Sequence, residues 1–262
     1  MKKIKYLILL SLAFSLPTFG LSIPKGLSTT DQEDVTKILG LGTSMKMATN
    51  PYPLGGYSGF EIGFDLNFIN IDQLTRLGCN PGESGCANTE RSEEQELSYG
   101  KITFGKGLYE NVDVFISFAP LFGAGSVSDY GASLRWTFYE AQLLPIHFLV
   151  LASGNQVNFR NQFSAQNMLV DLLVGINVDD ISVYFGGGQI QSEGHFIGGN
   201  VGEGTVPTGN PNLDAATNTS STSIRRFHTV VGASLEWNPL FIAGEINRYD
   251  DSVYTLKAGL RY

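Results

Sequence analysis

From residue 57 onward, apolar and polar side chains alternate along the chain with a period of two. In segment 58–69 one parity reads Phe60, Ile62, Phe64, Leu66 and Phe68, and the other reads Glu61, Gly63, Asp65 and Asn67. The same pattern recurs in 97–106, 112–121, 129–139, 145–153, 166–177, 181–190, 224–237, 240–247 and 254–262. Such segments match the length of strands that cross a bilayer at a tilt. A soluble β-sandwich alternates too, so the pattern alone leaves both folds open.

The lengths of the connections separate these two folds. The connections alternate between a longer and a shorter class: 70–95, 122–128, 154–164 and 192–221 against 107–111, 140–144, 178–180 and 238–239. Only 248–251 breaks this order. Membrane barrels sort their connections in this way, with long outer loops and short inner turns. We therefore predict an all-β, antiparallel, up-and-down transmembrane β-barrel of about ten strands with a short N-terminal helix. Eight or twelve strands stay open, because segment 97–106 is weakly patterned.

The N-terminal residues predict export. Residues 1–20 combine Lys2, Lys3 and Lys5 with a short apolar run and small residues suited to cleavage, the pattern of a signal peptide. An exported chain meets an oxidising compartment, so Cys79 and Cys86 are expected to form a local disulfide. The formal net charge of −8 argues against a nucleic-acid partner.

These features resemble bacterial outer-membrane β-barrel proteins over residues 57–262. The resemblance rests on the signal peptide, the sorted connections and the last strand, which ends in an aromatic residue. It implies a place in the outer membrane, contact with lipid and lipopolysaccharide, and handling by periplasmic chaperones and the barrel-assembly machinery. The family's assembly signal then corresponds to the apolar parity of the last strand: Tyr254, Leu256, Ala258, Leu260 and Tyr262.

Residues 21–56 do not alternate and form a helical and linker segment. Thr29 to Asp34 has the capping hydroxyls and early acids of a helix start. Val35, Ile38 and Leu39 share one helical face, and Gly40 or Gly42 is expected to end the helix. We expect this segment in the periplasm or at the lower rim, since a ten-stranded lumen is narrow and already filled. Entry into the lumen as a plug is the alternative.

Charged residues of both signs occupy the inward parity of the predicted barrel. These candidate lumen-lining residues are Glu61, Asp65, Lys101, Asp113, Arg135, His147, Asp171, Arg226, His228, Glu236, Glu245, Lys257 and Arg261. Buried charges must pair or be hydrated. The sequence therefore predicts an envelope protein, structural or surface-exposed, with a lumen closed by a charge network. A narrow porin-like channel for small polar solutes is the alternative.

An enzyme is the third and weakest interpretation. Omptin proteases also have ten strands, with acid pairs and an Asp-His pair at the outer rim. This chain offers His195 beside Glu193, with Asp129, Asp250 and Asp251 as further acids, but no Asp-His dipeptide. We therefore predict no catalytic residues, no metal site and no cofactor.

Overall fold

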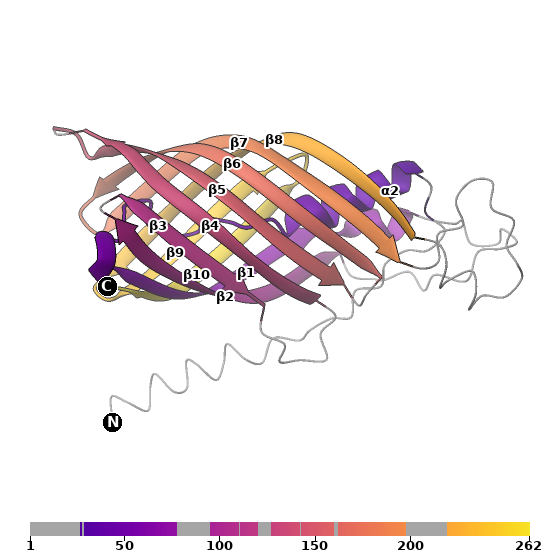
Figure 1. Ribbon diagram of the computed structural model, residues 1–262, viewed down its shortest axis with the longest axis horizontal. Helices are drawn as coiled ribbons and strands as arrows, with labels where there is room; N and C mark the ends of the chain where they lie inside the picture. Colours follow the sequence, from indigo (N-terminus) through magenta and orange to yellow (C-terminus); the bar gives the residue numbers. More distant parts are fainter. Residues whose placement is uncertain are drawn as a thin grey trace, which may run out of the picture.

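The chain folds into a closed ten-strand antiparallel barrel, which confirms the predicted fold and settles the strand count (Figure 1). The computed structural model describes residues 27, 29–77, 95–109, 111–119, 127–141, 143–159, 162–197 and 219–262. The strands are β1 (Phe60–Asn70), β2 (Glu96–Tyr109), β3 (Val112–Phe118), β4 (Val127–Glu140), β5 (Ile146–Phe159), β6 (Phe163–Val178), β7 (Ile181–Ile197), β8 (Thr219–Trp237), β9 (Leu240–Arg248) and β10 (Ser252–Arg261). Each strand pairs with its sequence neighbour, and β1 closes the barrel against β10. The predicted signal peptide and both cysteines lie outside the described residues.

The barrel has two unlike ends. At the turn end, short connections such as 179–180 and 238–239 join the strands, and both Tyr262 and the start of β1 lie there. At the loop end, β1 and β7 end and β2 and β8 begin. A short 3₁₀ helix, η2 (Gly56–Ser58), precedes β1 at the turn end, and another, η3 (Asp72–Arg76), follows β1 at the loop end.

Four strands are longer at the loop end than the sequence predicted. Residues 154–159, 163–164, 192–197 and 219–221 were expected in loops, but they belong to β5, β6, β7 and β8. Their outward side chains are polar, as at Gln156, Ser164 and Glu193, so the apolar parity that marked the strands stops there. The hydrogen-bonded ladder nevertheless continues, with Gln156 opposite Gln166. The wall of β5 to β8 thus extends beyond its apolar zone.

The barrel is apolar outside and charged inside. Leu172, Val231 and Leu256 expose 53%, 52% and 55% of their surface on the outer wall, whereas Arg135 and Asp113 inside expose none. On β8 the outward apolar zone runs from Phe227 to Trp237. Ten residues span about 33 Å along a strand, or roughly 25 Å in height at a tilt near 40°. This is the height of the apolar band of outer-membrane barrels.

An N-terminal helix precedes the barrel, as predicted. It begins as α2 (Thr29–Val35), continues as a π-helical turn, η1 (Thr36–Leu41), and ends at Gly42. Of the two glycines expected to end it, Gly40 lies within the helix. Among the described residues, no helix has the length and apolar character needed to cross a membrane.

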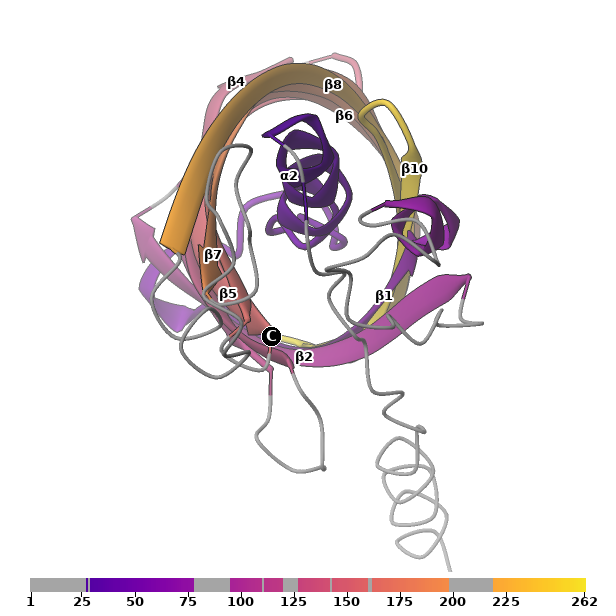
Figure 2. The same ribbon diagram turned by 90° about the vertical axis from the view of Figure 1, so that its right-hand side faces the viewer.

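The position of this helix corrects the sequence interpretation. Figure 2 looks along the barrel from the loop end and shows α2 inside the ring of strands, not at the lower rim. The segment enters at the loop end, where Leu27 packs with Phe159 and Phe163, and leaves at the turn end, where η2 leads into β1. The described chain therefore starts at the end of the barrel opposite to Tyr262. The physical reason is that much of the inward surface of β5 to β7 is apolar and needs a partner.

Candidate functional site

The loop half of the lumen is an apolar core between the helix and the wall. Val35 and Leu39 are fully buried against Phe159, Phe163 and Phe196 of β5, β6 and β7. The ring centroids of Phe163 and Phe196 lie 4.9 Å apart. Burial of aromatic and aliphatic side chains against each other is the main favourable term in such a contact. This half of the plug is therefore held by apolar packing.

Glycines allow the helix to approach the wall closely. A Cβ atom added to Gly40 would lie 2.2 Å from Ser192 Oγ on β7. A Cβ atom added to Gly194, also on β7, would lie 2.2 Å from Thr36 Oγ1 on the helix. The helix and β7 thus leave little room at these points of contact, so a larger residue at Gly40 or Gly194 would have to displace the facing side chain of Ser192 or Thr36.

The turn half of the lumen carries the charge network. Lys257 Nζ lies 2.9 Å from Glu61 Oε1, and Lys101 Nζ lies 2.5 Å from Asp129 Oδ2. His228 Nε2 lies 2.7 Å from Asp171 Oδ1. All of these side chains are buried, and buried charges are tolerated where they are paired and hydrogen-bonded.

Residues 43–54 run through this charged half of the lumen and bind its wall. Arg135 on β4 and Arg261 on β10 both donate to the carbonyl oxygens of Asn50 and Tyr52. The distances from Arg135 are 2.6 and 2.8 Å, and those from Arg261 are 3.0 and 2.5 Å. Arg261 also donates to the carbonyl of Pro53 at 3.0 Å. Two wall arginines thus hold one stretch of main chain from two sides.

Wall acids accept the main-chain amides of the same segment. The Ala48 amide donates to Glu245 Oε2 at 2.6 Å, and the Leu54 amide donates to Asp113 Oδ1 at 3.1 Å. Glu245 Oε2 also accepts the hydroxyl of Tyr184 at 2.5 Å. Hydrogen bonds to ionised acceptors are stronger than neutral ones. The acids therefore fix the segment as well as balance the wall cations.

Lys46 joins the two halves of the plug. Its ammonium donates to the carbonyls of Ser44 and Gly42, at 3.0 and 3.4 Å, just beyond the end of the helix. It also donates to the Tyr249 hydroxyl at 3.0 Å. A cation at a helix C-terminus interacts favourably with the helix dipole. Lys46 therefore stabilises the point where the helix becomes extended chain.

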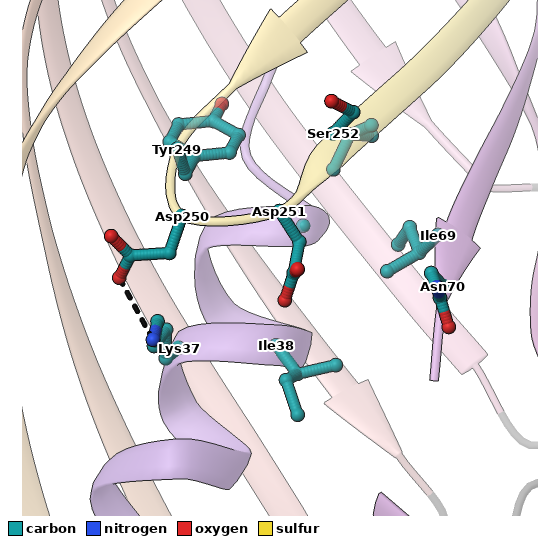
Figure 3. Close-up of a pocket in the computed structure, with 10 residues that line it drawn as sticks. Lys37, Ile38, Ile69, Asn70, Tyr249, Asp250, Asp251 and Ser252 are labelled. Atoms are coloured by element: carbon teal, nitrogen blue, oxygen red, sulfur yellow. Dashed lines mark ion pairs between the residues drawn. The ribbon is translucent and has the colours of Figure 1, made fainter. Parts of the chain in front are cut away.

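An ion pair at the loop end ties the helix to the β9–β10 hairpin. Lys37 Nζ lies 2.9 Å from Asp250 Oδ2. Figure 3 marks this ion pair with a dashed line. Arg226 Nε lies 3.5 Å from the same oxygen. The hydrogen bond from Lys37, together with the positive charges of Lys37 and Arg226, lowers the pKa of the Asp250 carboxyl. Since Asp250 is 46% exposed at its side chain, this contact is worth little by itself.

The structure places the predicted lumen-lining residues on the inner wall, although not all in one environment. Arg226 lies at the loop-end rim and is exposed, and Glu236 and Arg261 are partly exposed at the turn end. His147 makes an edge contact with the Tyr52 ring, with centroids 4.3 Å apart. The others are buried: Glu61, Asp65, Lys101, Asp113, Arg135, His147, Asp171, His228, Glu245 and Lys257. The network therefore binds residues 43–54 by hydrogen bonds and also connects neighbouring strands of the wall.

Sequence reasoning missed the apolar part of the inner wall along β5 and β6. Leu149, Leu151, Leu169 and Leu173 occupy inward positions and are buried. The signal was present in the sequence, because 148–151 is apolar on both parities. Apolar residues on both faces of a strand indicate that both faces are covered. That pattern favoured a plug over a polar lumen.

The acids considered for an omptin-like site do not converge. Asp129 lies in the lumen and accepts hydrogen bonds from Tyr99 and Asn155. His195 lies on the wall with Glu193, at 3.6 Å, and Asp250 pairs with Lys37. Within the part of the chain that the structure describes, no three His, Cys, Asp or Glu residues gather as a metal-ligand set.

Comparisons with known proteins return barrels of low similarity. No protein-family model matches the chain, and no curated protein matches its sequence. Among solved structures, the attachment invasion locus protein Ail of Yersinia pestis aligns at 12% identity and a TM-score of 0.30, covering 78% of this chain and 97% of Ail. A loop L8 deletion mutant of OmpT, an outer membrane protein of Vibrio cholerae, aligns at 10% identity and a TM-score of 0.30. The alignment covers 91% of this chain and 74% of the OmpT mutant. Neisserial surface protein A aligns at 9% identity and a TM-score of 0.26, and the alignment covers 77% of this chain and 95% of that protein. These values are too low to transfer a role to this chain.

Proposed function

We propose that this protein is an outer-membrane barrel of the bacterial envelope whose own residues 27–54 close the lumen. One observation carries the proposal: a single segment fills the loop half by apolar packing and the turn half by charged hydrogen bonds. The band of exposed apolar side chains on the outer wall fits membrane lipid. A closed lumen favours a structural or surface role over transport.

The cavities beside the plug are consistent with a closed lumen. One cavity lies between Lys46, Asp65 and Lys101 and has a volume of about 10 Å³. Another of about 10 Å³ lies between the helix and the β9–β10 hairpin (Figure 3). Such a volume holds about one water molecule. Neither cavity has room for a solute.

The exposed surface of the proposed envelope protein is its loop end. In outer-membrane barrels the connections at that end face outward, so we expect them to carry the protein's surface interactions. Lipopolysaccharide, the periplasmic chaperones and the barrel-assembly machinery are the partners we propose from the export and barrel pattern. β10 carries the corresponding assembly residues Tyr254, Leu256, Ala258, Leu260 and Tyr262 on its outer side and at its end.

Single-channel recording in planar bilayers tests the closed lumen. The full chain, verified as folded by its heat-modifiable migration, is expected to give no stable conductance steps. A variant lacking residues 29–54, verified in the same way, is expected to conduct. Stable steps from the full chain would contradict the closed lumen and favour the narrow channel. Silence from the folded deletion variant would show that the segment is not what closes the barrel.

A further inference from the structure

The turn half of the lumen contacts its occupant mostly through the occupant's main chain. Wall side chains bind four carbonyl oxygens, those of Thr43, Asn50, Tyr52 and Pro53. They also bind two amides, those of Ala48 and Leu54. Main-chain groups are the same in every residue except proline. Contacts of this kind recognise the conformation of a peptide more than its sequence.

The two arginines recognise one bent conformation of the main chain in particular. The chain bends at Pro51 and Tyr52, and the Tyr52 amide donates to Asn50 Oδ1 at 2.8 Å. Arg135 and Arg261 each donate to the carbonyls of Asn50 and Tyr52, on either side of Pro51. The planar guanidinium presents several donors in a fixed fork, which suits paired acceptors. The bend therefore sets both carbonyls within reach of each guanidinium.

Side-chain contacts between this segment and the wall are fewer. Thr49 Oγ1 donates to Glu61 Oε2 at 2.6 Å, and Asn50 Nδ2 donates to Glu236 Oε1 at 2.8 Å. Ser44 and Lys46 contact Tyr249. These contacts refine the fit, but the main chain supplies the bonds at both ends of the segment, from Thr43 to Leu54.

We propose that the turn half of the lumen is a binding site for a polypeptide main chain that bends as at Pro51 and Tyr52, with residues 43–54 as its resident ligand. The ligand class is a segment of about ten residues that supplies carbonyls to Lys101, Asn155, Arg135 and Arg261 and amides to Glu245 and Asp113. Another segment that adopts the same bend can occupy the site when the resident segment is absent. The linker at Gly55 and Gly56 permits this test, since both have positive φ and a Cβ atom added at either would have no neighbour within 4 Å.

The experiment inserts a protease site between Gly55 and Gly56 of the full chain and cleaves the folded protein there. The cleaved protein is unfolded in urea and refolded in detergent with a labelled synthetic peptide of residues 27–55, so that resident and labelled segments compete equally. A peptide with Ser44→Ala, Lys46→Met and Thr49→Val removes side-chain hydrogen bonds. A second peptide carries N-methyl groups on the Ala48 and Leu54 amides. A third carries them on the Met45 and Met47 amides as a matched control.

Retention in the barrel separates main-chain from side-chain recognition. We expect the side-chain variant to compete within about tenfold of the native peptide, since its main-chain bonds are intact. Methylation at Ala48 and Leu54 is expected to weaken retention by more than about 100-fold, and at Met45 and Met47 by much less. A side-chain variant that fails to compete, or equal retention of the two methylated peptides, would overturn the proposal. Loss of every fragment, including the native one, would do the same.

Discussion

Arg135 and Asp113 lie opposite each other on β4 and β3, with Arg135 Nη2 2.8 Å from Asp113 Oδ2 and neither side chain exposed. Arg135 also donates to two carbonyls of the plug, and Asp113 accepts the Leu54 amide. One ion pair therefore links two strands of the wall to the segment inside. Its loss should affect both the barrel and its closure.

The substitution Arg135→Met should destabilise the folded barrel by about 3–5 kcal/mol, because it leaves Asp113 buried without its cation. Urea unfolding in detergent, followed by heat-modifiable migration, measures this change. Arg225→Met is the control, since Arg225 is exposed on the outer wall and bonds only weakly to Gln191 at 3.0 Å. We expect the control to stay within about 0.5 kcal/mol of the parent. Equal effects of the two substitutions would refute this account of the pair.

Cysteines placed at Gly40 and Ser192 should form a disulfide that locks the helix to the wall. An added Gly40 Cβ lies 3.3 Å from Ser192 Cβ, near the separation of about 3.5–4.5 Å found across disulfides. Proteolysis and mass spectrometry, in a background with Cys79→Ser and Cys86→Ser, detect the linked peptides. Gly40→Cys with Gln191→Cys is the matched control, because Gln191 points outward on the same strand. Linkage in the control alone would place the helix outside the barrel.

Val231→Arg should impair insertion into lipid, because Val231 is 52% exposed near the middle of the apolar zone of β8. The expected cost is about 2–4 kcal/mol for a cation at the membrane midplane. Folding into lipid vesicles, followed by migration on gels, provides the measurement. Gln191→Arg lies beyond the apolar zone and should insert as the parent does. Normal insertion of the Val231 variant would argue against contact with lipid.

The Lys37–Asp250 pair should stabilise the plug only above acidic pH. The pKa of Asp250 is lowered in the folded protein, mainly by the hydrogen bond from Lys37. A group with a depressed folded pKa contributes stability above its unfolded pKa, near 4, and loses it as the pH falls through the folded value. A double-mutant cycle of Lys37→Met and Asp250→Asn should give a coupling below about 1 kcal/mol at pH 7 that disappears near pH 2. A coupling that grows on acidification would show that the ion pair is not its source.

The disulfide between Cys79 and Cys86 stays a prediction from the sequence, because both residues lie outside the described part of the chain. The protein purified without reductant should contain no reactive thiols, and its mass should rise by about two units on reduction. The loop-entropy model gives the bond about 2–3 kcal/mol. Two free thiols in the exported protein would refute the pairing.

The fold could be predicted from the sequence because each strand has one side in lipid and one side in the lumen. That arrangement produces an alternation of apolar and polar residues in the sequence. In β6, for example, Met168, Val170 and Leu172 face outward, and Asn167 and Asp171 face inward. The polar ends of β5 to β8 were predicted as loops. Beyond the apolar zone the outward side chains of these strands are polar, so the alternation that marks a strand is absent there. The charged residues of the inner wall were found by parity alone, but their pairings depend on the register between strands.

By itself, the sequence determined the barrel, the side of the wall on which the residues of the predicted strand segments lie, and the presence of a short helix before the first strand. Only the tertiary structure decided that this helix and residues 43–54 lie inside the barrel. The physical reason is that alternation records which face a side chain takes, but not what covers that face. An inward arginine looks the same in sequence whether it meets water, a wall carboxylate or a peptide carbonyl, and at Arg135 it meets the last two.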